Sequence, residues 1–278
     1  MKTVLVTGAS TGIGHACVLH LDRLGHRVYA GVRAEVHAQE LRSRGSGRIT
    51  PVFLDVTEQT CVAVAAAQIT EDHGGPDGIV NDAGIAKGGP LEYLPLATWR
   101  EQFDVNVLGQ VAVTKAMLPL IRAARGRIVF MGSISGKIAT MMLGPYCASK
   151  FALEAIGESL RHELHPWGVS VSVIESGAIK TAIWEKGRYK ADHLERGLPE
   201  QARTRYARHI AAIRKDIDRQ DRHGAHPDEL AKAVEHALLS PRPKTRYLVG
   251  TDAKIQNALV RWLPDKPREA IICKVAGP

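Results

Sequence analysis

Short apolar runs alternate along the chain with longer stretches in which apolar residues recur every three or four positions. The short runs fall at residues 4–6, 27–32, 49–54, 78–80, 127–131, 169–174 and 247–249. Runs that are apolar throughout are typical of strands buried on both faces of a sheet. The helical spacing falls at residues 12–24, 57–73, 98–125 and 146–165. Regular alternation of strand and helix predicts right-handed crossovers and therefore a parallel sheet.

This order of elements predicts an α/β fold class. We expect a single-domain Rossmann fold, with a doubly wound parallel sheet of about seven strands and helices on both faces. No linker or internal repeat divides residues 1–252, so we interpret them as one domain. Residues 177–225 interrupt the alternation and are interpreted as a mostly helical insertion before the last strand. Residues 253–278 form a C-terminal extension for which the pattern predicts no definite structure.

The composition is that of an ordinary globular protein, with 45% hydrophobic and 24% charged residues. No run approaches the ~18 apolar residues of a membrane span, and the first residues, MKTVLVTGAS, predict no signal peptide. The four cysteines show no CxxC spacing, which argues against disulfides or a zinc site and for a cytoplasmic location. The twelve histidines show no metal-binding spacing, so no metal is predicted.

The net charge of +8 raises the question of an anionic partner. The basic residues are spread along the chain, and where they are densest, at residues 196–223, acidic residues are interleaved with them. Aromatic residues make up 5% of the chain and do not alternate with a basic stripe. We therefore predict no nucleic-acid partner.

A glycine-rich loop follows the first strand. The sequence VLVTGASTGIGHA places Gly8, Gly12 and Gly14 between this strand and the first helix. Glycines allow close approach of the backbone, and a helix N-terminus offers free N–H groups to a diphosphate, so the loop predicts dinucleotide binding. The second strand ends just before Arg33, whose guanidinium can pair with a 2′-phosphate, while Glu35 is the competing ribose-binding candidate. NADP(H) is therefore favoured over NAD(H).

The stretch GPYCASKFALEA places Tyr146 four residues before Lys150 at the start of a predicted helix. Residues four apart are neighbours on a helix, so the phenol and the ammonium can meet. A free phenol has a pKa of about 10, and a nearby cation lowers such a pKa by roughly 1–3 units. The pair is therefore a candidate for proton transfer, with Tyr146 as general acid/base and Lys150 tuning its pKa.

Together these motifs resemble those of the classical short-chain dehydrogenases/reductases. The matching positions are residues 7–14 (TGxxxGIG), residues 54–56 (the adenine-side motif), residues 81–84 (resembling NNAG), Asn106, Ser133, Tyr146 and Lys150. They run in the family's order from residue 3 to about residue 181, whereas the remainder matches only loosely. The sequence around Tyr146 also resembles the hydroxysteroid and retinol dehydrogenase branch.

The resemblance implies that residues 1–252 are a Rossmann-type catalytic domain that transfers a hydride to or from a nicotinamide cofactor. In this scheme Ser133 orients the substrate oxygen, Lys150 also holds the nicotinamide ribose, and Asn106 holds a water that links Lys150 to solvent. The implied cofactor-binding residues are Gly8, Ser10, Thr11, Gly12, Ile13, Gly14, Arg33, Asp55, Val56, Asn81, Ala83, Gly84, Tyr146, Lys150, Gly177, Ile179 and Thr181.

Two positions depart from the family pattern. Asp82 replaces the second Asn of NNAG, a position that stabilises the central sheet in the family, so a carboxylate there alters local hydrogen bonding. Ser176 replaces the Pro of the Pro-Gly pair after the sixth strand, which loosens a turn beside the nicotinamide. Neither change removes a catalytic group.

Apolar loops beyond the strand ends indicate a hydrophobic substrate. They comprise residues 139–143, residues 91–94 and the apolar positions of the insertion. We predict an alcohol or carbonyl compound of the steroid, retinoid or long-chain lipid class. The helix predicted at residues 201–218 is a substrate lid, an oligomer contact or a membrane-surface element. The predicted substrate-contacting residues are Ser133, Met141, Leu143, Tyr146, Ile183 and Trp184.

Other functions share parts of this pattern. An acyl-carrier-type 3-ketoacyl reductase fits the basic surface, and a non-catalytic NADP-binding sensor fits the glycine loop alone. A sugar-nucleotide epimerase or dehydratase also uses YxxxK but with a different glycine motif. By resemblance we expect a homodimer or homotetramer that pairs through the helices of residues 107–125 and 147–165. Lys137 is expected to lie in solvent.

Overall fold

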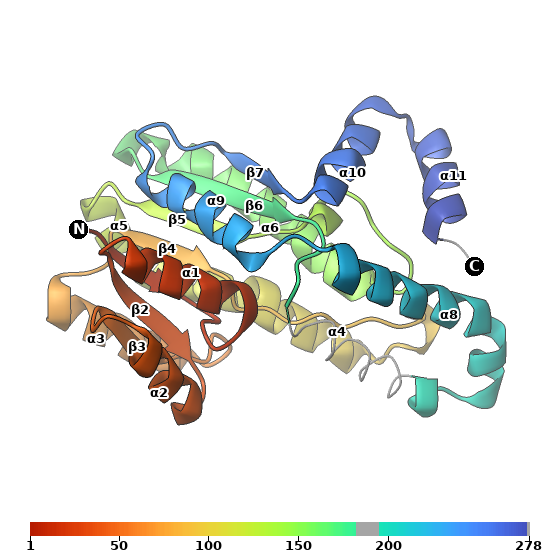
Figure 1. The fold of residues 1–278 in the computed structure, drawn as a ribbon, viewed down its shortest axis with the longest axis horizontal. Coiled ribbons are helices and arrows are strands. Elements are labelled where there is room, and N and C mark those ends of the chain that lie inside the picture. The colour runs from red at the N-terminus through yellow and green to blue at the C-terminus, as the bar shows by residue number, and fades with distance from the viewer. Residues whose placement is uncertain (182–194, 277–278) are drawn as a thin grey trace.

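The computed structural model describes residues 1–181 and 195–276. A seven-stranded parallel sheet lies between two layers of helices (Figure 1). Every strand pairs in parallel with its neighbours, which confirms the predicted fold class. The strands are β1 (Thr3–Val6), β2 (Arg27–Val32), β3 (Ile49–Phe53), β4 (Gly78–Asn81), β5 (Arg127–Met131), β6 (Ser170–Ser176) and β7 (Arg246–Val249).

The strands lie in the order β3-β2-β1-β4-β5-β6-β7. The sheet therefore grows in one direction from β1 to β3 and in the other from β4 to β7. Val4 of β1 is paired with Val28 of β2 on one side and with Gly78 of β4 on the other. Such a reversal opens a crevice at the carboxyl ends of β1 and β4, which is where ligands bind in open α/β sheets.

The helices flank this sheet and continue beyond its last strand. They are α1 (Gly12–Arg23), α2 (Glu35–Arg44), α3 (Gln59–His73), α4 (Leu96–Phe103), α5 (Gln110–Ala123), α6 (Gly144–Leu164), α8 (Glu200–His223), α9 (Pro227–Leu239), α10 (Thr251–Trp262) and α11 (Asp265–Ala276). Four shorter turns are η1 (Leu91–Tyr93), η2 (Asp104–Gly109, a π-helical turn), η3 (Ile134–Gly136) and η4 (His165–Trp167).

Side chains alternate between the two faces of the sheet and build two cores. Val4 and Val6 of β1 belong to the core under α1, α2 and α9. Leu5 points the other way, into the core under α3, α5 and α6. All three side chains are buried, and each such burial stabilises the fold by roughly 1.5–3 kcal/mol. Burial on both faces explains why the strand sequences are apolar throughout.

The structure corrects three of the predicted elements. The helix predicted at residues 98–125 is divided into α4 and α5 by the π-helical turn η2. Helices α2 and α9 occupy stretches for which no helix was predicted. The C-terminal extension is helical as well, forming α10 and α11.

Candidate active site

The glycine loop after β1 holds the start of α1 close to the loop after β4. Gly8 has a φ of +67°, and a Cβ there would lie 2.8 Å from the Cα of Ala83. A Cβ on Gly14 would lie 2.6 Å from the carbonyl oxygen of Gly8. Both positions therefore require glycine. The side chain of Thr11, at the N-cap of α1, makes no capping hydrogen bond, so it does not compete with an anion for the first N–H groups of α1.

Hydrogen bonds join the loops after β1 and β4 at the switch point of the sheet. The Thr7 hydroxyl accepts hydrogen bonds from the backbone N–H groups of Asp82 and Ala83, both at 3.0 Å. Asn81 is fully buried and donates to the Thr114 hydroxyl at 3.0 Å. Gly84, the last residue of this NDAG stretch, is exposed at the edge of the crevice. The structure thus brings both predicted cofactor loops together.

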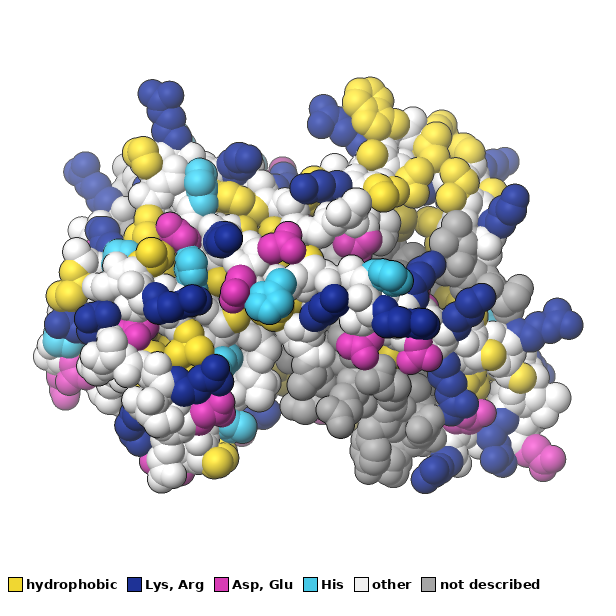
Figure 2. Space-filling view, viewed as in Figure 1, with side chains coloured by type: hydrophobic (Ala, Val, Ile, Leu, Met, Phe, Trp, Pro, Cys, Tyr) yellow, Lys and Arg dark blue, Asp and Glu magenta, His cyan; other side chains and the backbone are white. Residues whose placement is uncertain are grey.

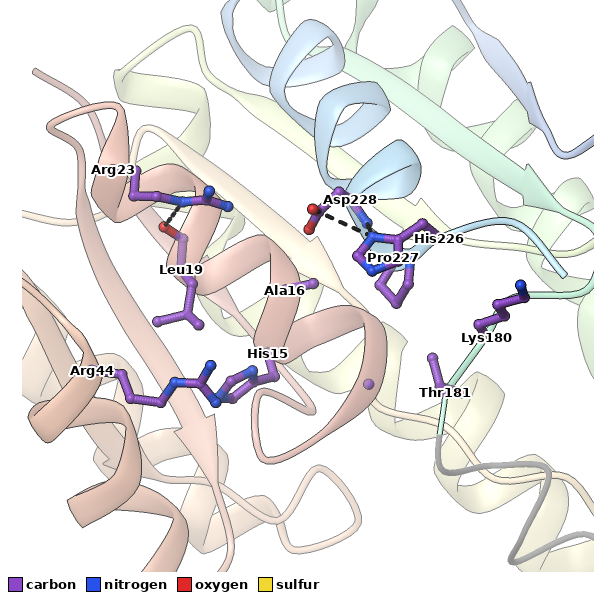
Figure 3. A pocket seen from close by; sticks show the side chains of 11 residues that line it. His15, Ala16, Leu19, Arg23, Arg44, Lys180, Thr181, His226, Pro227 and Asp228 are labelled. Carbon is purple, nitrogen blue, oxygen red and sulfur yellow. Dashed lines mark hydrogen bonds and ion pairs between the residues drawn. The ribbon is translucent and has the colours of Figure 1, made fainter. Parts of the chain in front are cut away.

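A cavity of about 300 Å³ borders the glycine loop. Gly12 and Thr181, which are both predicted cofactor residues, contribute to its lining. Figure 3 shows Thr181 and Lys180 across the opening from α1, while His15 and Arg44 lie together on the other side. Basic side chains outnumber the single carboxylate of the lining, so the edge of the glycine loop is electropositive and suits a phosphate.

At the other end of the crevice, Arg33 and Asp55 follow β2 and β3. The Asp55 carboxylate accepts hydrogen bonds from the Thr57 backbone N–H at 3.0 Å and hydroxyl at 2.7 Å. Burial raises its pKa, but the Thr57 hydrogen bonds and Arg33 outweigh burial, so the Asp55 pKa is lowered. The Arg33 side chain is 73% exposed and 3.7 Å from Asp55, whereas Glu35 is bound to Arg42 at 2.9 Å. Arg33 is therefore the more available partner for a ribose substituent.

Ser133, Tyr146 and Lys150 meet at the carboxyl end of β5. Ser133 follows β5, and its hydroxyl lies close enough to the Tyr146 side chain to lower the phenol pKa. The Lys150 ammonium lies 5.7 Å from the centroid of the Tyr146 ring and donates to the carbonyl of Met131 at 2.6 Å. Ser133 and Lys150 are buried, and Tyr146 is half-buried. Tyr146 and Lys150 lie one turn apart on α6, and the carboxyl end of β5 places Ser133 beside them.

The pKa values of the pair differ from the sequence-based expectation. Burial raises the pKa of the Tyr146 phenol, and the neighbouring Ser133 hydroxyl only partly opposes this effect. Burial also lowers the pKa of the Lys150 ammonium to about 8, although the charge of Asp82 works in the opposite direction. Because the ammonium is directed to the Met131 carbonyl, it does not lower the phenol pKa in this arrangement. The Ser133 hydroxyl is the group that lowers it.

Asn106 lies in the π-helical turn η2 and is fully buried. Its amide accepts from the Ile85 backbone N–H at 2.8 Å and donates to the Ile85 carbonyl at 3.0 Å. It also donates to the Ser149 hydroxyl at 3.2 Å, which in turn donates to the Tyr146 carbonyl at 2.7 Å. Asn106 therefore joins the loop after β4 to the start of α6. Both amide atoms of Asn106 are occupied by these partners. The role of Asn106 in holding a water stays a prediction.

The loop after β6 is fixed from the far end of the chain. The backbone N–H of Ala178 donates to the carboxylate of Asp252 at 2.8 Å, at the start of α10. The Ser133 hydroxyl donates to the carbonyl of Ser176 at 3.3 Å. Beyond this turn, Ile179 forms a bridge with Ala225. Asp252 thus holds the turn at which the family has a proline before Gly177. No sequence motif indicated this role of Asp252.

The interpretation of Lys137 as a solvated residue is wrong. Its ammonium lies 2.7 Å from the fully buried carboxylate of Glu175 and donates to Asn257 at 3.1 Å. Arg246 lies 3.3 Å from the same carboxylate and 2.9 Å from that of Glu154. Burial raises the Glu175 pKa despite these cations. The cluster joins the segment after Ser133 to β6, β7 and α10.

The predicted substrate residues are only partly described. Met141 and Leu143 are half-buried between Ser133 and α6. Their neighbour Met142 packs in one apolar cluster with Tyr93 of η1 and with Leu198, Ala202, Tyr206 and Ile210. Ile183 and Trp184 lie outside the described residues. An apolar cluster therefore includes Met142, which lies four residues before Tyr146, while the substrate contacts of Met141 and Leu143 stay predictions.

Asp82 places a carboxylate against the glycine loop. The Gly14 backbone N–H is hydrogen-bonded to it, and a Cβ on Gly14 would lie 2.7 Å from its Oδ2. Burial raises the Asp82 pKa to about 7, although the Lys150 charge and the Gly14 hydrogen bond both lower it. Between about pH 4 and pH 7 the folded protein therefore holds a proton that the unfolded chain has lost, and stability falls as pH rises through this window.

We expect Asp82→Asn to stabilise the protein most at alkaline pH. At pH 8 the gain should be about 2 kcal/mol, after discounting for solvent screening, and it should be smaller at pH 5. Thermal unfolding of both proteins at the two pH values measures it. Asp104→Asn removes an exposed carboxylate and serves as the control. An Asp82→Asn effect that is equal at both pH values would contradict the burial argument.

Among the described residues, no group of His, Cys, Asp and Glu side chains is arranged to hold a metal ion. The four cysteines are free. The described helices include none with the length and apolar character needed to cross a membrane.

Known proteins resemble this chain over nearly its whole length. A family model described as short chain dehydrogenase matches residues 2–192. Retinol dehydrogenase 16 of Homo sapiens is 37% identical over 278 residues, covering 98% of this chain and 87% of that protein. The 17-beta-hydroxysteroid dehydrogenase type 6 of Bos taurus is 35% identical, covering 98% and 88%.

Solved structures show the same architecture. A short-chain dehydrogenase from Streptomyces avermitilis superposes with a TM-score of 0.75 at 27% identity, covering 94% of this chain and 95% of that one. The matched share of this chain is larger than the span of residues 2–192 that the family model covers.

Proposed function

The chain belongs to the short-chain dehydrogenase family, and from that premise we propose that it interconverts a hydrophobic alcohol and its ketone or aldehyde with NADP(H). Members of this family are oxidoreductases that bind a nicotinamide cofactor. The observation that carries the proposal is the contact of Tyr146 with Ser133, with the Lys150 ammonium 5.7 Å from the phenol ring, at the carboxyl edge of the sheet. A sensor that only binds the cofactor has no need of this cluster.

The glycine loop, the N-terminus of α1 and the NDAG loop fit a dinucleotide, which would supply hydride acceptance or donation when bound. During alcohol oxidation Tyr146 takes the hydroxyl proton, and during carbonyl reduction it returns that proton to the developing oxyanion. Ser133 donates to the same oxygen and orients it. Lys150, whose ammonium lies 5.7 Å from the centroid of the phenol ring, would hold the nicotinamide ribose. Asn106 acts as a positioning residue that holds α6 against the loop after β4.

Arg33 supports the preference for NADP(H). Its guanidinium is exposed at the carboxyl end of β2, where an NAD site would have a carboxylate. Asp55 is already held by Thr57, and Glu35 is held by Arg42. A 2′-phosphate would therefore meet the exposed guanidinium of Arg33, although the Asp55 carboxylate lies 3.7 Å from it.

We place the substrate between the loop after β5 and α8, and we treat residues 177–225 as a lid. Tyr206 of α8 donates to Glu92 at 2.8 Å and packs edge-on against Tyr93 at 6.2 Å between ring centroids. These contacts hold α8 over η1. The similar proteins are named for retinol and a hydroxysteroid, and the apolar cluster at Met142 suits substrates of that class.

A substrate panel tests this proposal. We expect NADP⁺-dependent oxidation of all-trans-retinol or of a hydroxysteroid, with kcat/KM at least about 100-fold above that for reduction of a carrier-linked 3-ketoacyl thioester. The reverse order would favour the 3-ketoacyl reductase alternative. Tight NADPH binding without turnover of any compound would favour the sensor alternative.

We further propose that the enzyme pairs through α5 and α6 and works in the cytoplasm. Leu108, in the turn η2 before α5, and Phe151 of α6 expose 59% and 44% of their surfaces, which a partner subunit would cover. The free cysteines fit a reducing compartment. Light scattering that gives the mass of a monomer would refute the pairing.

A further inference from the structure

The outer face of the helical hairpin formed by α10 and α11 carries accessible apolar side chains. Ile255, Ala258, Leu259 and Trp262 recur at helical spacing along α10. Ile255 is 58% exposed and Trp262 75% exposed, and of the large apolar side chains that the structure describes only Met1 is more exposed than Trp262. Figure 2 shows hydrophobic side chains gathered over α10 and α11, with Lys and Arg side chains around them. This outer face is a surface apart from the candidate active site.

The opposite face of the hairpin already anchors it to the protein. Ala253 is fully buried, and Val260 and Ile272 pack with Ile134 and Ile138. The apolar side chains of the outer face are therefore not needed to hold the hairpin in place. Exposed apolar side chains at helical spacing, on a helix that is already anchored by its other face, indicate a surface that binds another molecule or a membrane.

The charge of the hairpin indicates what this surface meets. Residues 251–276 contain five basic and three acidic side chains. Asp252 is turned inward onto the N–H of Ala178, and Asp265 is paired with Arg268 at 2.6 Å. Four basic side chains are exposed, namely Lys254, Arg261, Lys266 and Lys274, against the two exposed carboxylates of Asp265 and Glu269. The accessible face is thus apolar at its centre and mainly positive at its edges.

The pair Arg261 and Trp262 combines both features. The guanidinium lies 5.3 Å from the centroid of the indole ring, so charge and apolar surface are presented together. Trp is enriched where an apolar phase meets water, and Arg and Lys beside it are attracted to anionic headgroups. A two-fold contact with a second copy would instead place like charges opposite one another.

We propose that the outer face of α10 and α11 docks on an anionic lipid surface. Ile255 and Trp262 enter the boundary between headgroups and acyl chains, and the basic side chains contact the headgroups. Docking would be peripheral and would be weakened by salt. It does not depend on the proposed substrate. It would place the neighbouring helix α8, which α11 contacts, close to the lipid.

Vesicle flotation of the full chain tests this proposal. We expect binding to phosphatidylcholine vesicles containing about 30% phosphatidylserine, weaker binding to phosphatidylcholine alone, and a loss at 0.5 M salt relative to 0.1 M. The double variant Ile255→Ser/Trp262→Ser should bind about tenfold or more weakly, because two large apolar side chains no longer transfer from water. Lys254→Glu/Lys266→Glu should remove the preference for phosphatidylserine.

The matched control is Val36→Ser/Val64→Ser, which removes two exposed apolar side chains from α2 and α3. It should bind vesicles like wild type. All variants change exposed positions, and equal thermal midpoints would show that they fold alike. Two results would overturn the proposal: wild type that floats with neither vesicle type, or a hairpin variant that binds as wild type does. A dimer in solution that Trp262→Ser converts to a monomer, without vesicle binding, would assign the face to a subunit contact.

Discussion

The Tyr146→Phe variant should oxidise the alcohol substrate about 1,000-fold more slowly than wild type while binding NADP⁺ with an unchanged Kd. Phenylalanine keeps the ring and its packing but cannot take the hydroxyl proton, and general acid–base groups contribute roughly 10²–10⁴-fold to rate. Ser133 would remain in place through its hydrogen bond to the carbonyl of Ser176. Steady-state kinetics give kcat, and quenching of protein fluorescence gives the Kd of the cofactor.

Tyr29→Phe is the matched control for this loss. It removes a hydroxyl that donates to Asp72 at 3.0 Å, far from the crevice, and should leave kcat unchanged. Because burial raises the Tyr146 pKa, wild-type oxidation should also rise with pH through the alkaline range, where the phenolate forms. Tyr146→Phe should lack this rise. Activity of Tyr146→Phe close to that of wild type would refute the assignment of Tyr146.

Arg33→Asp should raise the Kd of NADPH at least about 100-fold and change that of NADH less than about threefold. A charge-assisted pair with phosphate contributes about 1.5–3 kcal/mol, and the new carboxylate adds repulsion. Only the 2′-phosphate distinguishes the two cofactors, so the loss should fall on NADPH. Fluorescence titration of both cofactors measures it.

Arg42→Asp makes the same change of net charge on α2, where Arg42 is paired with Glu35. It should affect the two cofactors about equally and weakly. If Arg33→Asp weakens NADPH and NADH by the same factor, Arg33 does not read the 2′-phosphate and the preference for NADP(H) is wrong.

The positions of the strands along the chain and the motifs of the candidate site could be read from the sequence because each rests on local sequence. Strands buried on both faces must be apolar throughout, and the spacing of Tyr146 and Lys150 needs only one helix. The glycine loop can also be recognised from local sequence, because Gly8 and Gly14 have neighbours that leave no room for a side chain. The assembly of Ser133 with Tyr146 then follows from the parallel sheet, which places the end of β5 beside the start of α6.

Other features depend on partners that are distant in the sequence. The π-helical turn at Asn106 fits the hydrogen bonds of its amide to the backbone of Ile85, which helical spacing does not reveal. Lys137 follows η3, whereas its partner Glu175 lies in β6, so the local sequence around Lys137 does not indicate the ion pair. Asp252 follows β7 in the sequence, and only the pairing of β7 with β6 brings it to the turn at Ala178. Helix α2 buries only two of its residues, so its sequence shows little periodicity.

Direct transfer of hydrogen from the alcohol carbon to the cofactor is the central claim, and an isotope experiment tests it. The enzyme would be incubated with NADP⁺ and all-trans-retinol, or the hydroxysteroid that it oxidises best, carrying deuterium on the carbinol carbon. Mass spectrometry and NMR of the reduced cofactor would then locate the label. The account predicts one deuterium per turnover on one face of the nicotinamide ring, with none in Tyr146→Phe samples above the residual rate. Product that forms while the label appears in water would contradict it.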